Sequence, residues 1–222
     1  MLVPYCFGAV AGAIASGRVP SGGEAGDPWD SWVNPTSVLG GVLAIVVVAY
    51  LAAVYLVWDA HRLGDEPMVS YFRRRAIGAA VLAGAVALTG IFVLRSDAPY
   101  LFEELTTKAL PVVLISAACG TASLAFLIRN APGGARLLAV GAVASVVVAW
   151  GVAQWPYLLP ETLKIADAAA PDGTLGALLV ATVGAALIVL PGFILLYTLD
   201  QKNLLPEEST SPGVDGNEVR TR

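Results

Sequence analysis

Long uncharged apolar runs alternate along the chain with short segments that carry charge, proline or glycine. A bilayer core about 30 Å thick needs roughly 20 apolar residues of α-helix to cross it. The runs are continuous, whereas the strands of a membrane β-barrel are about ten residues long and alternate in polarity. Five runs therefore predict five spanning helices, at residues 38–58, 76–94, 109–128, 137–153 and 175–199.

A sixth, shorter run at residues 2–17 begins almost at Met1 and lacks the basic flank and small-residue cleavage site of a secretory signal. It reads as the end of a helix cut short at its start. The predicted fold is thus an all-α integral membrane protein, a polytopic bundle of about six transmembrane helices within residues 1–202. From residue 203 the chain is polar and rich in Pro, Gly and Ser, so residues 203–222 are predicted to form a disordered cytoplasmic tail.

Composition agrees with a membrane protein, because 57% of the 222 residues are apolar and only 14% are charged. A soluble domain carries about 25% charged residues. The mean hydropathy of +0.73 is too high for a domain that must keep a polar surface in water. The net charge of −4 excludes a nucleic-acid reader built on a basic stripe.

The positions of the basic residues predict the orientation, because short loops rich in Lys and Arg stay on the cytoplasmic side. The predicted cytoplasmic segments carry Arg62, Arg73, Arg74, Arg75, Arg129, Arg136 and Lys202. The other three loops hold nine acidic residues and are predicted to lie outside. Met1 and the C-terminus would then both be cytoplasmic. The predicted outer aromatic belt comprises Trp29, Trp32, Tyr100, Trp155 and Tyr157.

Small residues spaced four apart favour close packing of membrane helices. Gly8 and Gly12 form one such pair, although Ala and Gly are also simply common in these helices. The same spacing recurs in the pairs Ala80 and Gly84, Ser116 and Gly120, and Gly141 and Ser145. Pro111 and Pro191 are expected to bend their helices, or, for Pro111, to occupy a first turn.

The chain offers little of the chemistry expected of an ion-coupled carrier or a redox centre. None of the five long runs contains Asp, Glu, Lys, Arg or His, which proton pumps and voltage sensors place at membrane depth. Haem or metal ligation draws on His, Met and Cys. The chain has only His61, Met1, Met68, Cys6 and Cys119. We therefore predict no catalytic and no metal-binding residue, a surface or interfacial His61, and buried thiols at the two cysteines.

The loop at residues 154–174 combines aromatic, apolar and proline residues with few charges. We expect it to lie in the membrane interface or under a partner. Its sequence WPYLLPETLKIADAAAPDGTL, with the later LPGFILLYTL, resembles the C-terminal part of subunit II of the cytochrome bd-type quinol oxidases. The earlier segment GAVAGAIASGRVPSGGEAGDPWDSWVNPTSVLGGVLA resembles the middle of that subunit.

This resemblance covers about residues 5–202 and implies a subunit of nine helices, of which about three N-terminal ones are missing here. It also implies a partner, subunit I, that carries b-type and d-type haems and the quinol site and reduces dioxygen to water. In most descriptions subunit II of this family binds no haem, so the resemblance implies that this chain binds none. Within the outer-face motif of the family, the matching residues are Trp155, Pro156, Pro160 and Asp167.

Two functions follow as hypotheses. The first is a non-haem structural subunit of a bd-type terminal oxidase in the bacterial cell membrane, which contacts membrane lipid and meets quinol only through the complex, with the chemistry in subunit I. The second is a small independent permease that dimerises through its small-residue faces. Because the helix interiors are uncharged, such a permease would carry a neutral or hydrophobic solute.

Overall fold

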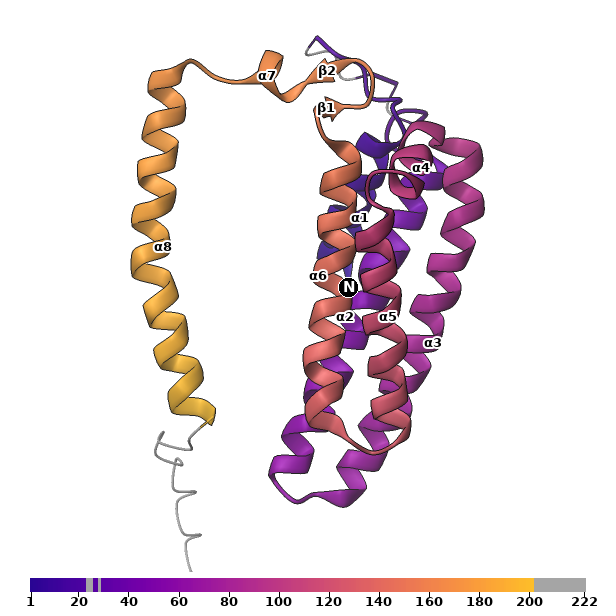
Figure 1. Ribbon diagram of the computed structural model, residues 1–222, viewed down its shortest axis with the longest axis vertical. Helices are drawn as coiled ribbons and strands as arrows, with labels where there is room; N and C mark the ends of the chain where they lie inside the picture. Colours follow the sequence, from indigo (N-terminus) through magenta and orange to yellow (C-terminus); the bar gives the residue numbers. More distant parts are fainter. Residues whose placement is uncertain (23–25, 28, 202–222) are drawn as a thin grey trace, which may run out of the picture. The chain divides into compact units, whose positions relative to one another are not determined.

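A computed structural model describes residues 1–22, 26–27 and 29–201. It divides into two units, residues 1–168 and residues 169–222, and each is described by itself. The predicted tail at residues 203–222 lies outside the described residues. The first unit is a helical bundle, and the second contains one long helix (Figure 1).

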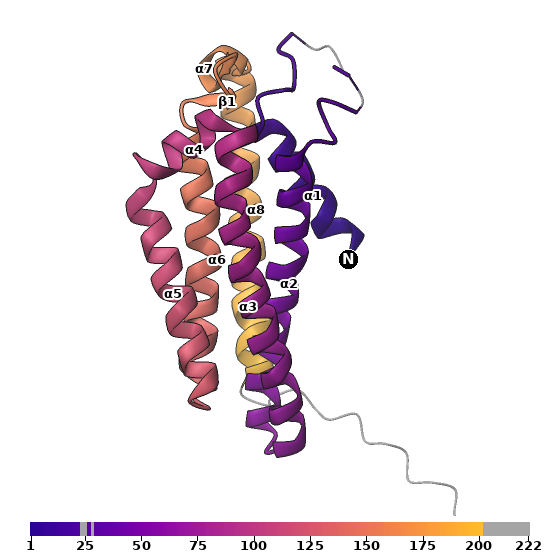
Figure 2. The same ribbon diagram turned by 90° about the vertical axis from the view of Figure 1, so that its right-hand side faces the viewer.

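The helices of the first unit are α1 (Leu2–Ala15), α2 (Pro35–Arg62), α3 (Glu66–Asp97), α4 (Pro99–Thr106), α5 (Leu110–Ile128), α6 (Pro132–Gln154) and α7 (Ile165–Ala168). The long ones run in both directions along one bundle axis, and the short helices α4 and α7 lie at one end, as Figures 1 and 2 show. The second unit holds α8 (Asp172–Gln201).

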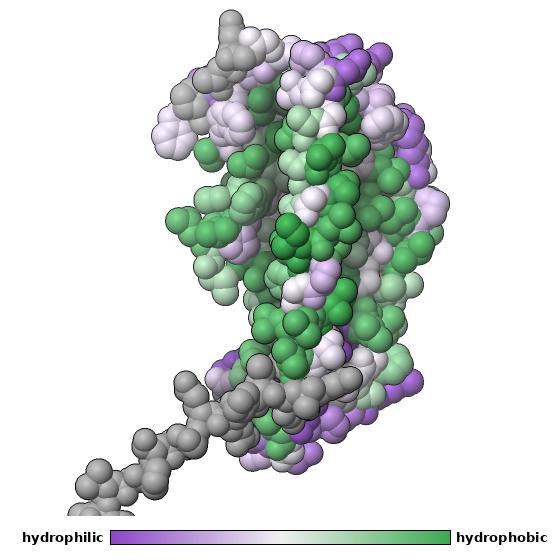
Figure 3. Space-filling view, turned by 90° about the vertical axis from the view of Figure 1, so that its left-hand side faces the viewer, coloured by the Kyte–Doolittle hydropathy of each residue, from purple (hydrophilic) through white to green (hydrophobic). Residues whose placement is uncertain are grey.

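Five of these helices, α2, α3, α5, α6 and α8, are long and apolar enough to cross a membrane. With its 14 residues, α1 is a shorter apolar helix. The predicted all-helical membrane fold is therefore confirmed as five candidate spans and one short apolar helix. Figure 3 shows one face of the molecule, on which apolar side chains occupy the middle and hydrophilic side chains gather at both ends.

The helix starts follow from local chemistry. Asn34 caps α2, because its side chain accepts a hydrogen bond from the backbone N–H of Ser37, and Pro35 occupies the first turn. Asp65 caps α3 in the same way through Met68. Pro111 also lies in the first turn of its helix, which confirms the second of the two readings of this proline. By contrast, Pro191 lies inside α8.

The main packing contacts of the first unit are between α1 and α2, α2 and α3, and α5 and α6, and α2 also contacts α6. One buried apolar cluster includes Val54, Val57, Val69 and Leu127 and so joins α2, α3 and α5. A second cluster around Leu101 and Ala153 joins α4 to α6. The two clusters give the bundle a core of small and β-branched side chains.

The small-residue pairs divide into two groups. A Cβ atom added at Gly8 or Gly12 would come within 3.0 Å of α2 backbone atoms, so the close approach expected for this pair is present. Ser116 donates a hydrogen bond of 2.8 Å to the Ala142 carbonyl, and Gly141 lies against Cys119 Sγ, so α5 and α6 also meet at small residues. In the fourth pair, Ala80 packs against the first buried cluster, whereas at Gly84 no atom of the described residues lies within 4 Å of an added Cβ.

Candidate functional site

Polar side chains join α1, α2 and α3 at the end of the bundle where α3 ends. Asp97, the last residue of α3, has a side chain that is only 7% exposed. Its Oδ2 accepts hydrogen bonds from the Thr36 backbone N–H at 3.0 Å and the Thr36 hydroxyl at 2.6 Å. Its Oδ1 pairs with the Arg18 guanidinium. A buried carboxylate is stable only when it is paired and hydrogen-bonded, and both conditions hold here.

Asn34 extends these contacts to the end of α1. Its Nδ2 donates to Ser16 Oγ at 3.1 Å and to the Ser31 carbonyl at 3.3 Å, while its Oδ1 caps α2. Ser37 Oγ lies within 3.0 Å of the Ala9 carbonyl and 2.8 Å of the Trp32 carbonyl. We call these residues the polar junction: Ser16, Arg18, Asn34, Thr36, Ser37 and Asp97. The polar junction joins the ends of α1, α2 and α3 by hydrogen bonds and an ion pair.

The four residues of the sequence motif lie just before, within and just after one short hairpin. The hairpin consists of β1 (Tyr157–Leu159) paired antiparallel with β2 (Leu163–Lys164). Trp155 is 64% exposed, whereas Pro160 is buried and lies beside Gly17 in the loop after α1. The Pro156 carbonyl accepts a hydrogen bond from Ile165 N–H at 3.1 Å. Asp167 is exposed on α7, and within the described residues no hydrogen bond joins its side chain to the other three.

The hairpin end of the bundle also holds a charged pair that the sequence did not single out. Lys108 Nζ lies 2.8 Å from the Glu104 carboxylate, and this contact raises the pKa of the Lys108 ammonium. Burial raises the pKa of the Tyr100 phenol, and the Glu104 charge adds to this effect. Tyr100 also makes an edge-to-face contact with Tyr157, with ring centroids 5.8 Å apart. This contact ties α4 to the hairpin.

Gln154, at the end of α6, is a further polar residue that sequence reasoning missed. It is 7% exposed, and its Nε2 donates to the Leu158 carbonyl at 3.3 Å. Its Oε1 is buried with no hydrogen-bond partner in the described part of the chain. The amide thus fixes the start of the hairpin to the end of α6.

Two polar side chains meet inside the spans. The hydroxyls of Tyr50 on α2 and Ser123 on α5 lie 2.6 Å apart, and Ser123 Oγ donates to the Ala135 carbonyl of α6 at 2.8 Å. All of these atoms belong to buried residues. The hydrogen bonds join three helices, and no titrating carboxylate or amine takes part in them.

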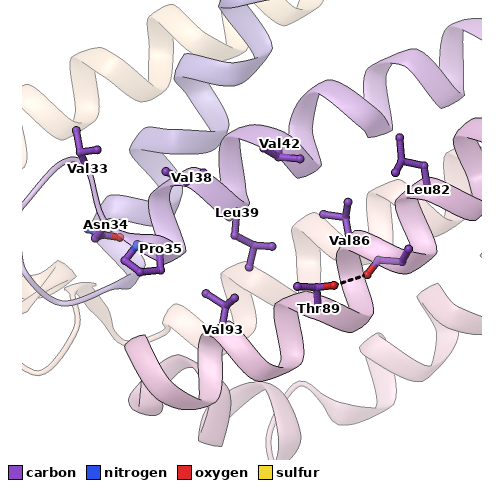
Figure 4. A pocket seen from close by; sticks show the side chains of 11 residues that line it. Val33, Asn34, Pro35, Val38, Leu39, Val42, Leu82, Val86, Thr89 and Val93 are labelled. Carbon is purple, nitrogen blue, oxygen red and sulfur yellow. Dashed lines mark hydrogen bonds between the residues drawn. The ribbon is translucent and has the colours of Figure 1, made fainter.

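An apolar groove of about 760 Å³ runs along the contact between α2 and α3 (Figure 4). In the close-up, Val38, Leu39 and Val42 from α2 face Val86 and Val93 from α3, and Asn34 lies at one end. Thr89 is the polar side chain of the α3 wall, and its hydroxyl bonds to the Ala85 carbonyl of its own helix. The groove therefore presents an apolar surface with few polar groups.

The side chains that could hold a haem or metal do not converge. Within residues 1–22, 26–27 and 29–201, no group of three or more His, Cys, Asp or Glu side chains could hold a metal ion. His61 is exposed beyond the apolar part of α2, and Met68 is 47% exposed on α3. The expected burial of both thiols is wrong, because Cys6 is exposed and Cys119 only half-buried. Cys6 lies on a part of α1 that α2 does not cover.

Taken together, the spans and their polar contacts define a polytopic helical membrane protein whose polar groups serve mainly to join helices. The family model for cytochrome bd terminal oxidase subunit II matches residues 1–200, and the chain belongs to that family. The resemblance seen in the sequence is therefore confirmed. A comparison with the curated proteins finds no match.

The solved structure of bd oxidase from Geobacillus thermodenitrificans is similar in fold, with a TM-score of 0.67 and 24% sequence identity. The match covers 91% of this chain and 62% of that chain, so the chain spans less than two thirds of the length of its structural relative. At this identity the similarity concerns the fold.

Proposed function

We propose that this chain is the non-haem structural subunit of a bd-type terminal quinol oxidase in the bacterial cell membrane. Its partner would be a haem-bearing subunit I, in which quinol is oxidised and dioxygen is reduced to water. The observation that carries the proposal is the family match over residues 1–200. That match favours a subunit of an oxidase over an independent permease.

The His and Met side chains of the described residues do not line a buried haem pocket. Axial ligands of haem are His, Met, Cys or Tyr side chains that face a buried pocket. His61 and Met68 are exposed, Met1 is 76% exposed, and the buried Tyr50 hydroxyl is already bonded to Ser123. The b-type and d-type haems of the proposed complex would therefore belong to subunit I.

Helix α8 supports a role in a larger assembly. Considered by itself, it is a 30-residue helix with apolar side chains around its whole circumference. A helix that is apolar on all sides must be surrounded by lipid or by other protein. In the proposed complex, lipid and subunit I would supply that surrounding.

The orientation is part of the proposal. The arginines lie in the turns between α2 and α3 and between α5 and α6 and in the adjoining ends of these helices, and this end of the bundle would face the cytoplasm. The polar junction and the hairpin would then face outward, at the opposite end of the bundle. Attachment of a membrane-impermeant thiol reagent to single cysteines introduced at Ser70 and at Glu161 would test this orientation in intact cells.

We also propose that Trp155 and Asp167 contact subunit I on the outer face. Both side chains are exposed, whereas Pro160 and the Pro156 carbonyl have contacts within the chain. Pro156 and Pro160 would thus shape the hairpin that presents the other two. An aromatic ring and a carboxylate are residue types that serve well as an anchor and an orienting group in an interface.

Co-expression of the tagged chain with the subunit I of the same organism tests the proposal. We expect subunit I to co-purify, with the absorption of b-type and d-type haems in the purified complex. The variants Trp155→Ala and Asp167→Asn should lower recovery of subunit I, and the matched control Glu161→Gln, an exposed residue of the same hairpin, should not. Haem bound to the chain alone, or full assembly of subunit I without the chain, would contradict the proposal.

A further inference from the structure

The end of the bundle opposite the polar junction carries an excess of positive charge. The segments 59–75 and 129–136 contain six arginines and three carboxylates. The ion pairs of Arg18 with Asp30 and Asp97 and of Lys108 with Glu104 lie at the other end. Asp65, one of the three carboxylates, is occupied as the cap of α3, and Asp59 and Glu66 are exposed. An anion from outside the chain would be attracted to this end.

Arg136 of α6 is held in a defined place there by two aromatic rings of α2. Its guanidinium carbon lies 4.9 Å from the centre of the Trp58 ring and 5.5 Å from that of the Tyr55 ring. Cation–π contacts of this kind orient a guanidinium. Gly133 makes room for the indole, because a Cβ atom there would come 2.9 Å from Trp58 Cζ3. Within the described part of the chain the Arg136 guanidinium contacts these rings and makes no hydrogen bond or ion pair, so its N–H groups can donate to a ligand.

The same place holds a buried donor that has no acceptor. Trp58 Nε1 is buried and makes no hydrogen bond within the described part of the chain. Arg73 Nε, on the neighbouring helix α3 at this end of the bundle, is in the same condition. Buried donors are nearly always satisfied in folded proteins. Because Trp58 Nε1 has almost no accessible surface, an acceptor from outside the chain reaches it when the side chains that cover it move.

Apolar side chains surround this site on the membrane side. Leu137 follows Arg136 directly and is 72% exposed, and Leu56 and Tyr55 are 43% and 39% exposed. A ligand that combines negatively charged oxygens with hydrocarbon chains would satisfy the donors and cover these side chains together. A free anion would do only the first.

We propose that Arg136 and Trp58 bind the phosphate of an anionic phospholipid in the membrane leaflet at this end of the bundle. The Arg136 N–H groups and Trp58 Nε1 donate to the phosphate oxygens, and Leu56 and Leu137 contact the acyl chains. Arg73 adds positive charge at the same end. Phosphate suits this donor set because it accepts several hydrogen bonds at once and pairs with the planar guanidinium of arginine.

The test uses the full chain purified in a neutral detergent and short-chain phosphatidylglycerol as the probe, with bound lipid counted by native mass spectrometry. Arg136→Gln should weaken binding about tenfold, because a charge-assisted hydrogen bond is lost. Trp58→Phe keeps a ring under Arg136 and removes only the N–H donor, so a loss of about threefold is expected. The matched control is Arg95→Gln, an exposed arginine near the other end of α3.

Two further probes separate the sources of phosphate. Phosphatidylcholine, whose headgroup has no net charge, should bind at least about tenfold more weakly than phosphatidylglycerol. Inorganic phosphate should not displace the lipid at equal concentration, and displacement would identify a site for free phosphate instead. Equal binding of the two lipids, or an equal loss in Arg95→Gln, would overturn the proposal.

A second substitution at Arg136 distinguishes a loss of lipid binding from a failure to fold. Arg136→Lys keeps the charge but loses the planar fork, so it should fold and bind phosphatidylglycerol more weakly than the wild type. If Arg136→Lys and Trp58→Phe both fold and each binds phosphatidylglycerol as tightly as the wild type, the proposed geometry is contradicted. Exclusion of the lipid when subunit I is bound would show that a protein surface covers the site, and would also overturn the proposal.

Discussion

Tyr50 donates its hydroxyl proton to Ser123 inside the bundle. The two oxygens lie 2.6 Å apart, and Ser123 Oγ lies 2.8 Å from the Ala135 carbonyl, to which it must be the donor. A serine hydroxyl has one proton. Because Ser123 uses that proton on Ala135, it can only accept from Tyr50. The direction of the chain of hydrogen bonds, from α2 through α5 to α6, is therefore fixed.

This direction predicts unequal effects of removing the two hydroxyls. Tyr50→Phe leaves Ser123 bonded to Ala135 and should cost about 0.5–1 kcal/mol of the free energy of unfolding. Ser123→Ala leaves the Tyr50 hydroxyl buried without a partner and should cost about 1–3 kcal/mol. The measurement is unfolding in mixed micelles with increasing denaturing detergent. Equal costs for the two variants would contradict the assigned direction.

Loss of the Asp97 carboxylate should release the polar junction. Asp97→Asn replaces a charged acceptor of three hydrogen bonds with a neutral amide, and we expect a loss of about 1.5–3 kcal/mol. Thr36→Ala removes a single hydroxyl donor and should cost about 1 kcal/mol. Arg95→Gln, two residues before Asp97 and exposed, serves as the control. An Asp97→Asn variant as stable as that control would show that the ion pair contributes nothing.

The sequence predicted the spans well because the apolar runs are long and free of charge. It was less accurate at the helix ends. The run at 76–94 lies within a helix that begins at Glu66, since the Asp65 cap and the arginines that follow extend α3 beyond the apolar stretch. The short helix α4 and the hairpin were not predicted, because their apolar residues are few and follow no clear period.

The polar contacts could be anticipated only in part. Asn34 followed by Pro35 and Ser37 is a helix-start signal that the sequence shows plainly. The pairing of Arg18 with Asp97 joins residues 79 positions apart, and no local sequence pattern predicts it. Tyr50 and Ser123 lie in separate uncharged runs, where a lone hydroxyl is as compatible with packing against its own helix as with bonding to another.

The contact between Glu104 and Lys108 predicts an alkaline loss of stability. The pKa values of Lys108 and Tyr100 are both raised in the folded chain above their usual values of about 10.4 and 10. Groups of this kind stabilise the fold fully below their unfolded pKa, and the contribution is lost as the pH rises through the folded pKa. The melting temperature should therefore fall as the pH is raised above about 10.

Glu104→Gln provides the comparison for this pH dependence. It removes the acceptor charge that raises the pKa of Lys108 and part of the effect on Tyr100, so its melting temperature should fall less steeply over the same pH range. Glu103→Gln changes the exposed neighbouring carboxylate and should follow the wild type. Parallel curves for the wild type and Glu104→Gln would show that the contact is not present in solution.

Gly8 and Gly84 predict opposite responses to the same substitution. At Gly8 an added Cβ would lie 2.7 Å from Ala44 Cβ and closer still to the Gly40 carbonyl, so α1 would be forced away from α2. Overpacking of this kind costs about 1–3 kcal/mol, and Gly8→Ala should lower the melting temperature. At Gly84 no atom lies within 4 Å, and alanine favours a helix over glycine by about 1 kcal/mol. Gly84→Ala should therefore leave the melting temperature unchanged or raise it. If Gly84→Ala lowers the melting temperature as much as Gly8→Ala does, the close contact between α1 and α2 is not what makes Gly8→Ala destabilising.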